Sequence, residues 1–158
     1  MTRSEFLAGR LREVFLTGTW IANTNYRQQL GAIPWQTGIA RIQNLNTIAQ
    51  LTFHIHYYVK GLLEVLKGGE LTIHDKYSFD LPPITSESMW KVLVEEFLHD
   101  AEAFADRVEQ LDDALLDQPF VQEKYGTYLR NIEGVIEHSY YHLGQIALLH
   151  KILLQRSV

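Results

Sequence analysis

The sequence has no cysteine, and it also lacks long apolar runs. Without cysteine there are no disulfide bonds, no metal sites built on thiolates and no cysteine nucleophile. No apolar stretch approaches the roughly 20 residues that are needed to cross a bilayer. The first fifteen residues are charged and amphipathic, unlike a secretory signal with an apolar core. We therefore expect a cytoplasmic protein with no membrane partner.

Positive charge is also scarce. The chain carries 14 Lys and Arg against 19 Asp and Glu, for a net charge of -5, and its basic residues form no long cluster. Proteins that bind nucleic acids follow the phosphates with clustered basic side chains, so we expect no nucleic-acid partner. The length of 158 residues and the 46% apolar and 21% charged residues are typical of a folded domain. We expect a single domain over residues 1–158.

Helical periodicity dominates what is present. Apolar residues recur at helical spacing from about residue 3 into the twenties, and over 47–67, 86–111 and 129–155. A shorter helix is expected over 35–42, after Pro34. Gly18 and the polar residues 23–25 weaken the second half of the first stretch, which leaves room for a break there. The pattern predicts an all-α protein, most simply a four-helix bundle.

The ends of these helices have local signals. Asn46 is a plausible N-cap for the second long helix, and the two glycines at 68 and 69 would end it. Thr85 or Ser86 would cap the third. The stretch "GGELTIHDKYSFDLPP", residues 68–83, is rich in turn-forming residues and is predicted to be a loop. Loops of this length often carry function.

The last helix contains two histidines four residues apart, His138 and His142. Side chains at i and i+4 lie on one face of a helix, so both imidazoles can reach one metal ion. The helical zinc proteases use the same spacing, but their glutamate is missing here because Ser139 follows His138. A protease of that type is excluded. Since such a pair also arises easily by chance, a metal site needs a third ligand.

The second long helix offers two candidates for the third ligand, His54 and His56. Both border the apolar stripe of the helix, so periodicity does not choose between them. His54 has small residues one heptad away on either side, which weakly favours it. His74, in the 68–83 loop, is placed to lean over a site. His99 and His150 have no partner at ligand spacing and are expected at the surface or its edge.

Two phrases in the sequence, "NTIAQLTFHIHYY" (46–58) and "IEHSYYHLGQI" (136–146), resemble the DinB/YfiT-like superfamily of metalloenzymes. Members of this family have a histidine followed by isoleucine in the second helix, and a His-x-x-x-His pair followed by x-Gly-Gln in the last. Here these positions are His54, His138 and His142. "LTGTWIA" (16–22) is similar to the first-helix region of the family, and the resemblance spans nearly the whole chain.

The resemblance implies an up-up-down-down four-helix bundle that often dimerises. It also implies that His54, His138 and His142 hold one divalent ion, and Zn²⁺ or Ni²⁺ is the ion that we expect first. Three imidazoles with an open position suit a catalytic rather than a structural site. The sequence departs from many relatives at Tyr141, where they have a further histidine.

Two functions follow from this reading. The first is a metal-dependent hydrolase or thiol-dependent S-transferase acting on a small-molecule substrate, with a small thiol as cosubstrate in the second case. Candidate helper residues are Tyr58, Tyr140 and Gln145 on the helices, and Tyr77 and Asp80 on the loop, which would cover a pocket beside the ion.

The alternative is a non-enzymatic metal-binding, sensing or interaction module, in which the ion braces the bundle. Three aromatic residues, Phe53, Tyr57 and Tyr141, point away from the apolar stripes of their helices. Large exposed apolar patches are unusual on a monomer, so we expect a homodimer that buries these side chains.

Overall fold

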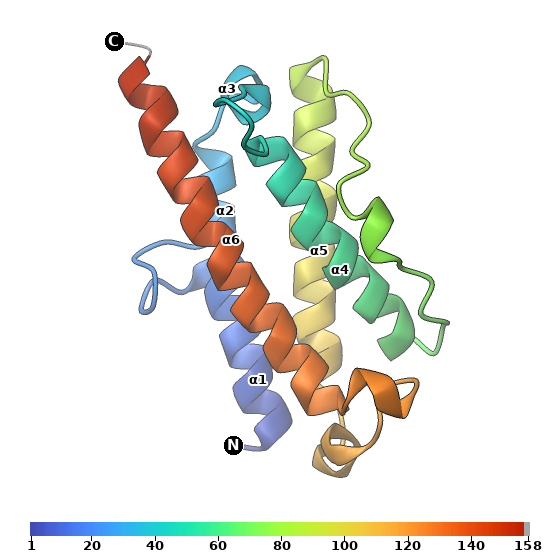
Figure 1. Ribbon diagram of the computed structural model, residues 1–158. Coiled ribbons are helices and arrows are strands. Elements are labelled where there is room, and N and C mark those ends of the chain that lie inside the picture. Colours follow the sequence, from blue (N-terminus) through green and yellow to red (C-terminus); the bar gives the residue numbers. More distant parts are fainter. Residues whose placement is uncertain (157–158) are drawn as a thin grey trace.

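Four long helices form the body of the molecule in the computed structural model, which describes residues 1–156 (Figure 1). They are α1 (Arg3–Arg12), α4 (Ile48–Leu66), α5 (Glu87–Glu109) and α6 (Tyr128–Arg156). Two short helices, α2 (Tyr26–Gly31) and α3 (Trp35–Ile39), lie between α1 and α4. Within residues 1–156 there is no strand beyond one isolated bridge between Pro119 and Thr127. The prediction of an all-α helical bundle is confirmed.

The helices α1 and α6 run in one direction, and α4 and α5 run in the other (Figure 1). The order along the chain is therefore up, down, down, up, which differs from the up-up-down-down order that we expected. Because α4 and α5 are consecutive and parallel, the chain must return the length of the bundle between them. The segment 68–84, called the strap below, makes this return along the outside of α4 and α5.

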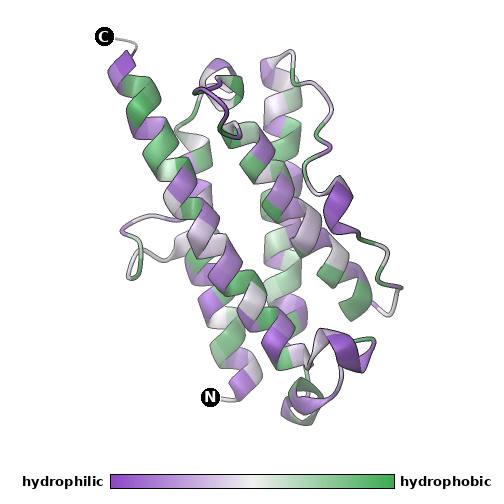
Figure 2. Ribbon diagram, in the orientation of Figure 1, coloured by the Kyte–Doolittle hydropathy of each residue, from purple (hydrophilic) through white to green (hydrophobic). Residues whose placement is uncertain are grey.

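The long helices have one buried side each. Figure 2 shows that each carries both hydrophobic and hydrophilic residues, and the buried ones face the interior. At the centre of the core, the rings of Phe15, Tyr26 and Phe97 lie 5.2–5.6 Å apart. None of the described helices combines the length and apolar composition that a membrane crossing requires.

The first helical stretch is broken, as its glycine and polar residues suggested. It passes from α1 into a π-helical turn, Glu13–Thr17, and then into irregular chain before α2 begins. Gly18 is required at this point because a Cβ there would lie 2.1 Å from the Cγ of Glu13. Asn25 then caps α2, and its side-chain amide donates to the carbonyl of Gly18 at 3.0 Å.

The predicted caps are right at α5 and wrong by one residue at α4. Ser86 caps α5 by accepting a hydrogen bond from the N–H of Met89. The cap of α4 is Thr47 rather than Asn46, since Thr47 forms a reciprocal capping box with Gln50. α4 ends at Leu66, just before Gly68, whose φ of 90° favours glycine. The helix expected over 35–42 ends earlier, at Ile39.

The strap is irregular apart from one 3₁₀ turn, Asp75–Tyr77, and it is tied to α4. The Tyr57 hydroxyl donates to the carbonyl of His74 at 3.1 Å and accepts from its N–H at 2.9 Å. The Tyr58 hydroxyl donates to the Asp75 carboxylate at 3.0 Å. Gly61 allows the close approach, because a Cβ there would lie 2.6 Å from the Cγ2 of Ile73.

Candidate metal centre

The three histidines singled out in the sequence meet where α4 passes α6. His54 comes from α4, and His138 and His142 come from successive turns of α6. The Nε2 of His138 lies 3.2 Å from that of His54 and 2.9 Å from that of His142. One ring nitrogen from each residue lies within 4.8 Å of the other two. The structure thus brings together the three predicted residues.

The spacing of these nitrogens fits a single metal ion. With zinc–nitrogen bonds of about 2.0–2.1 Å, two ligands of a tetrahedral ion lie roughly 3.3–3.4 Å apart. The two Nε2 separations around His138, 3.2 and 2.9 Å, are close to this value. Imidazole nitrogen suits zinc and nickel among the common divalent ions.

In two of the rings, the nitrogen that faces away from the cluster lies beside an oxygen that can only accept a hydrogen bond. The Nδ1 of His54 lies 3.3 Å from the carbonyl oxygen of Ser78, and the Nδ1 of His142 lies 2.6 Å from the Oε1 of Gln145. Each acceptor places the ring proton on Nδ1, which leaves the Nε2 lone pair directed at the centre of the cluster. A cation at this centre can accept a lone pair from the Nε2 of each ring. Outward hydrogen bonds of this kind are typical of metal-bound histidines.

The electrostatics of the cluster keep the rings neutral. Burial, and then the neighbouring His142 and His54, lower the pKa of His138 to about 4. Burial and the proximity of His142 also lower the pKa of His54. Burial lowers the pKa of His142, although its hydrogen bond to Gln145 acts in the opposite direction. At neutral pH all three imidazoles are therefore in the deprotonated form that binds metal.

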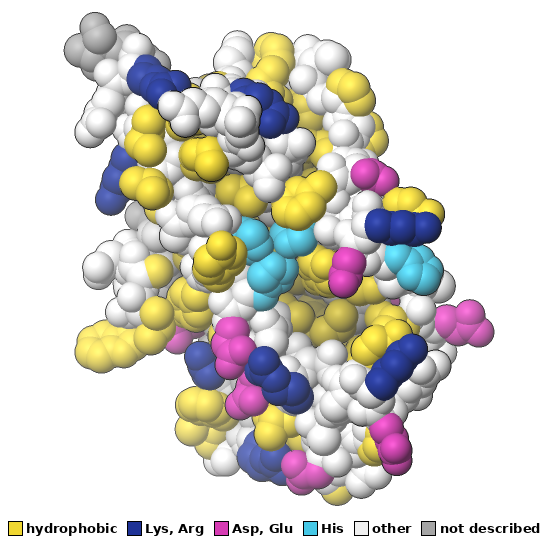
Figure 3. Space-filling view, in the orientation of Figure 1, with side chains coloured by type: hydrophobic (Ala, Val, Ile, Leu, Met, Phe, Trp, Pro, Cys, Tyr) yellow, Lys and Arg dark blue, Asp and Glu magenta, His cyan; other side chains and the backbone are white. Residues whose placement is uncertain are grey.

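The cluster is sheltered but not sealed. His54 and His142 are each 7% exposed and His138 is half-buried. Figure 3 shows histidine side chains gathered at the centre of one face of the molecule, where they reach the surface. Phe79 of the strap stacks on His54 with ring centroids 4.0 Å apart, and the ring of Tyr58 lies 5.4 Å from that of His138. Aromatic rings thus cover part of the cluster.

A groove leads away from His138 between α4 and α6. A cavity of about 340 Å³ begins at this residue and is lined by Tyr58, Leu62, Tyr125, Arg130, Asn131, Gly134, Val135 and His138. A neighbouring cavity of about 490 Å³ shares Tyr58, Leu62, Tyr125 and Asn131 and extends along strap residues 73–76. The expected pocket therefore lies beside the first part of the strap and along α6, rather than under the whole strap.

The structure places some of the helper residues proposed from the sequence at the histidine cluster and others elsewhere. Tyr58 lies against the cluster, and Gln145 holds His142. Tyr140 instead lies near Arg10 and Glu13, at the end of α1. Burial and the charge of Glu13 raise its pKa, and the charge of Arg10 lowers it. On the strap, Tyr77 contacts His74 and Lys76 rather than the cluster.

Two further expectations about the strap need correction. Asp80 is exposed and its side chain has no hydrogen bond or ion pair within residues 1–156. His74 lines the second cavity but is exposed and does not join the three histidines. The strap residues that do touch the site, Ser78 and Phe79, were missed. Ser78 acts through its backbone carbonyl, which any residue could supply, so its side chain gives no signal in the sequence.

The remaining histidines lie apart from the cluster. His56 is buried on the other flank of α4, where its Nε2 lies 2.7 Å from the Oδ2 of Asp100. His99 is exposed and His150 is half-buried, as expected for residues at the surface or its edge.

A helical bundle with three histidines contributed by two of its helices defines a class of protein, and a comparison of sequences supports the same class. The family model of the DinB superfamily matches residues 24–146, more than three quarters of the chain. The protein therefore belongs to the DinB superfamily. The matched region includes His54, His138 and His142. Neither a curated protein nor a solved structure gives a significant match to this chain.

Proposed function

We propose that this protein is a metal-dependent enzyme in which His54, His138 and His142 hold one divalent ion, Zn²⁺ or Ni²⁺. The observation that carries the proposal is the convergence of three Nε2 atoms beside a groove, with two of the outer nitrogens already hydrogen-bonded. A structural zinc site is closed by a fourth protein ligand. Among the described residues, no fourth His, Asp or Glu joins this group.

The donor set suits hydrolysis or transfer of a thiol group. A divalent ion held by three neutral ligands keeps its full charge, so it acts as a Lewis acid that lowers the pKa of a water molecule or a thiol. We propose either a hydrolase or a thiol-dependent S-transferase acting on a small molecule in the groove, with a small thiol as cosubstrate in the second case.

The chain's own residues orient this site. Ser78 and Gln145 fix the two outer rings, and Phe79 keeps solvent from one face of His54. Burial raises the pKa of Tyr58, so its hydroxyl stays protonated and donates to Asp75 at neutral pH. This hydrogen bond holds the strap over the edge of the groove.

One observation favours the alternative, a non-enzymatic metal-binding or sensing module. The carboxylate nearest in the hydrogen-bond network is Asp75, and Tyr58 already occupies it. Besides Tyr58, Tyr141 contacts the cluster, with its ring centroid 4.8 Å from that of His142, and among the described residues no carboxylate joins the three histidines. In a sensing module the ion would brace α4 against α6, and a partner would bind the surface.

The two functions differ in whether the ion has an open position. We expect the absorption spectrum of the Co²⁺-substituted protein to change when azide or 2-mercaptoethanol is added, because the added ligand occupies that position. A spectrum of four protein ligands that responds to neither compound would establish a closed site and the non-enzymatic function. Co²⁺ added to the His138→Ala variant serves as the control for binding elsewhere.

A further inference from the structure

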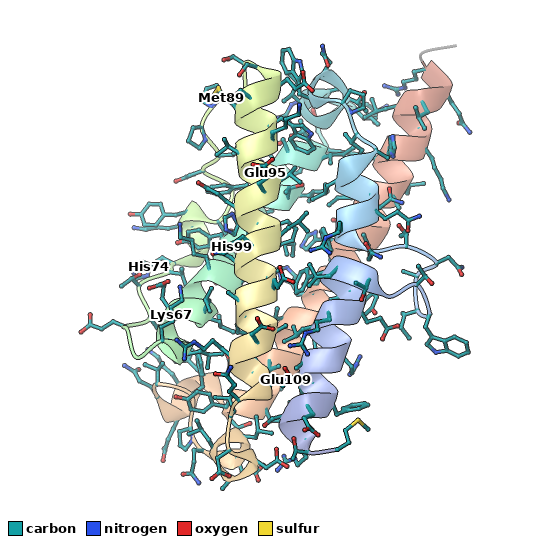
Figure 4. All side chains as sticks on the ribbon, turned by 180° about the vertical axis from the view of Figure 1, so that it is seen from behind. Lys67, His74, Met89, Glu95, His99 and Glu109 are labelled. Atoms are coloured by element: carbon teal, nitrogen blue, oxygen red, sulfur yellow. The ribbon has the colours of Figure 1, made fainter. Side chains whose placement is uncertain are left out.

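A third cavity lies on the flank of α4 that faces away from the three histidines. Its volume is about 610 Å³, larger than either cavity beside His138. One wall is α4, the other is α5, and the strap forms the roof. Figure 4 views the molecule from behind and labels Met89, which lines this cavity near the start of α5. This volume is typical of a site for a small molecule.

The two ends of the cavity differ in chemistry. α4 and α5 run parallel but offset, because His56 of α4 pairs with Asp100 of α5, and Phe53 and Glu96 each lie about one turn before that pair. One end of the cavity, beside the start of α5, is apolar and is formed by Leu81, Pro82, Ile84 and Met89. The other end, beside the later residues of α4, is charged and contains Lys60 and Glu64, and Glu96 lies between the two ends. A ligand that fills the cavity must therefore be apolar at one end and charged at the other.

Only some of the charged groups around this cavity already have a hydrogen-bond or ion-pair partner. Glu64 forms an ion pair with Lys67 at 3.0 Å, and Asp100 is bonded to His56 in the wall. Lys60 and Glu96 have no ion pair or hydrogen bond within residues 1–156. They belong to opposite walls, Lys60 to α4 and Glu96 to α5, and are not within ion-pair distance of each other. One ammonium and one carboxylate thus remain for a ligand.

We infer that this cavity binds a small zwitterion with an apolar tail, of the kind represented by amino acids with large apolar side chains. Glu96 pairs with the ligand's ammonium group, Lys60 pairs with its carboxylate, and the apolar end of the cavity receives the side chain. The strap closes over the ligand through Ile73, Leu81 and Ile84. The three histidines take no part, so the inference holds whether or not the proposed enzyme activity is correct.

Three probes with the same apolar tail separate the contributions of the ligand's ammonium and carboxylate groups to binding. Homophenylalanine carries both charged groups, 4-phenylbutanoate lacks the ammonium, and 3-phenylpropylamine lacks the carboxylate. Binding is followed in the metal-free protein by the NMR shifts of the methyl groups around the cavity, those of Ile73, Leu81, Ile84, Met89, Val92 and Leu93. We expect homophenylalanine to bind most tightly and each truncated probe to bind about two- to fivefold more weakly, as for exposed ion pairs.

Matched variants assign each charge to its partner. In Glu96→Gln, homophenylalanine should bind no better than 4-phenylbutanoate, whose own affinity should be unchanged or slightly higher. In Lys60→Gln, homophenylalanine should bind no better than 3-phenylpropylamine. Glu95→Gln makes the same charge change on the next residue of α5, which faces a different cavity (Figure 4), and should leave all three affinities unchanged. Val92→Trp, at an exposed position on the rim, should fill the cavity and abolish binding.

Three results would overturn the inference. Equal affinities for the three probes would show an apolar surface without charge recognition. Equal weakening of all probes by Glu96→Gln and Glu95→Gln would remove the assigned role of Glu96. Methyl shifts that depend on protein concentration without any probe, and that disappear in Val92→Trp, would show that a second copy of the chain occupies the cavity.

Discussion

Three histidines carry the proposed function, and their surroundings differ. His138 is central, because its Nε2 lies within 3.2 Å of the Nε2 atoms of both neighbours. It is also the residue whose pKa is lowered furthest among the three, to about 4. His54 and His142 are instead fixed from outside by Ser78 and Gln145. The cluster is therefore assembled around His138.

The lowered pKa of His138 predicts how the stability of the metal-free protein depends on pH. The usual histidine pKa of 6.5 applies to the unfolded chain, while the folded value is about 4. Between these values the unfolded state binds the extra proton, so the free energy of unfolding falls as the pH falls through this window. Because solvent reaches the half-buried ring, we expect His138 to account for a loss of about 1–2 kcal/mol between pH 7 and pH 5.

Urea denaturation at the two pH values measures this loss, and the His138→Gln variant isolates it from other groups. Wild type should lose more stability than the variant by the stated amount. Equal losses in the two proteins would show that His138 is not held neutral by its surroundings.

The sequence identified the three histidines of the cluster only in part. Helical spacing brought His138 and His142 together, but it left His54 and His56 open as the third candidate. The family phrase favoured His54, and the structure places His54 beside His138 and His56 beside Asp100. No sequence pattern could predict the role of Ser78, because it contributes a backbone carbonyl that is positioned by the path of the strap.

Among the elements, the strap and α4 act together. The hydroxyls of two adjacent tyrosines on α4, Tyr57 and Tyr58, hold the strap at His74 and Asp75. The strap then supplies Ser78 and Phe79 to the histidine cluster on one side of α4. On the other side it roofs the larger cavity. Its close contact with α4 is therefore a condition for both sites.

Gly61 tests this contact. In Gly61→Ala the added methyl group would collide with the β-branched side chain of Ile73, which has little freedom to move aside. We expect a loss of about 1–3 kcal/mol in the free energy of unfolding, as for overpacking, and faster amide hydrogen exchange in the strap.

Gly9→Ala is the matched control, because Gly9 lies in α1 and has no heavy atom within 4 Å of an added Cβ. The same change there should stabilise the protein by about 0.5–1 kcal/mol through helix propensity. If Gly61→Ala were as stabilising as Gly9→Ala, the strap would not be packed tightly against α4.

The bounds of the long helices were predictable because their signals are local. The expected ranges 47–67, 86–111 and 129–155 differ by at most two residues at either end from α4, α5 and α6. The order of helix directions and the π-helical turn at Glu13–Thr17 were not predictable in this way. Both depend on how distant parts of the chain pack against one another, which a single stretch of sequence does not contain.

Several large apolar side chains are exposed at the surface of the molecule. Tyr141 and Leu148, one heptad apart on α6, are 63% and 59% exposed. Phe53 and Tyr57, which we expected to face a second subunit, instead line the cavity beneath the strap. The proposal of a homodimer therefore rests on the outer face of α6.

Light scattering tests the dimer. We expect a mass near twice the chain mass of 18.3 kDa at micromolar concentration. Leu148→Glu should raise the dissociation constant at least about tenfold, because it places a charge in an apolar interface. Glu102→Gln, a change at an exposed residue of α5 rather than α6, is the control. Wild-type protein that scatters as an 18.3 kDa monomer would contradict the proposal.

The metal content of four single variants tests the central claim most directly. The proteins are purified without chelator and incubated with one equivalent of Zn²⁺, unbound metal is removed, and the metal in each chain is measured. We predict close to one ion per chain in wild type and in His56→Ala, and a large loss in His54→Ala, His138→Ala and His142→Ala, since two ligands hold the ion far less tightly than three. Full metal content in both α6 variants, or its loss in His56→Ala with retention in His54→Ala, would contradict the three-histidine site.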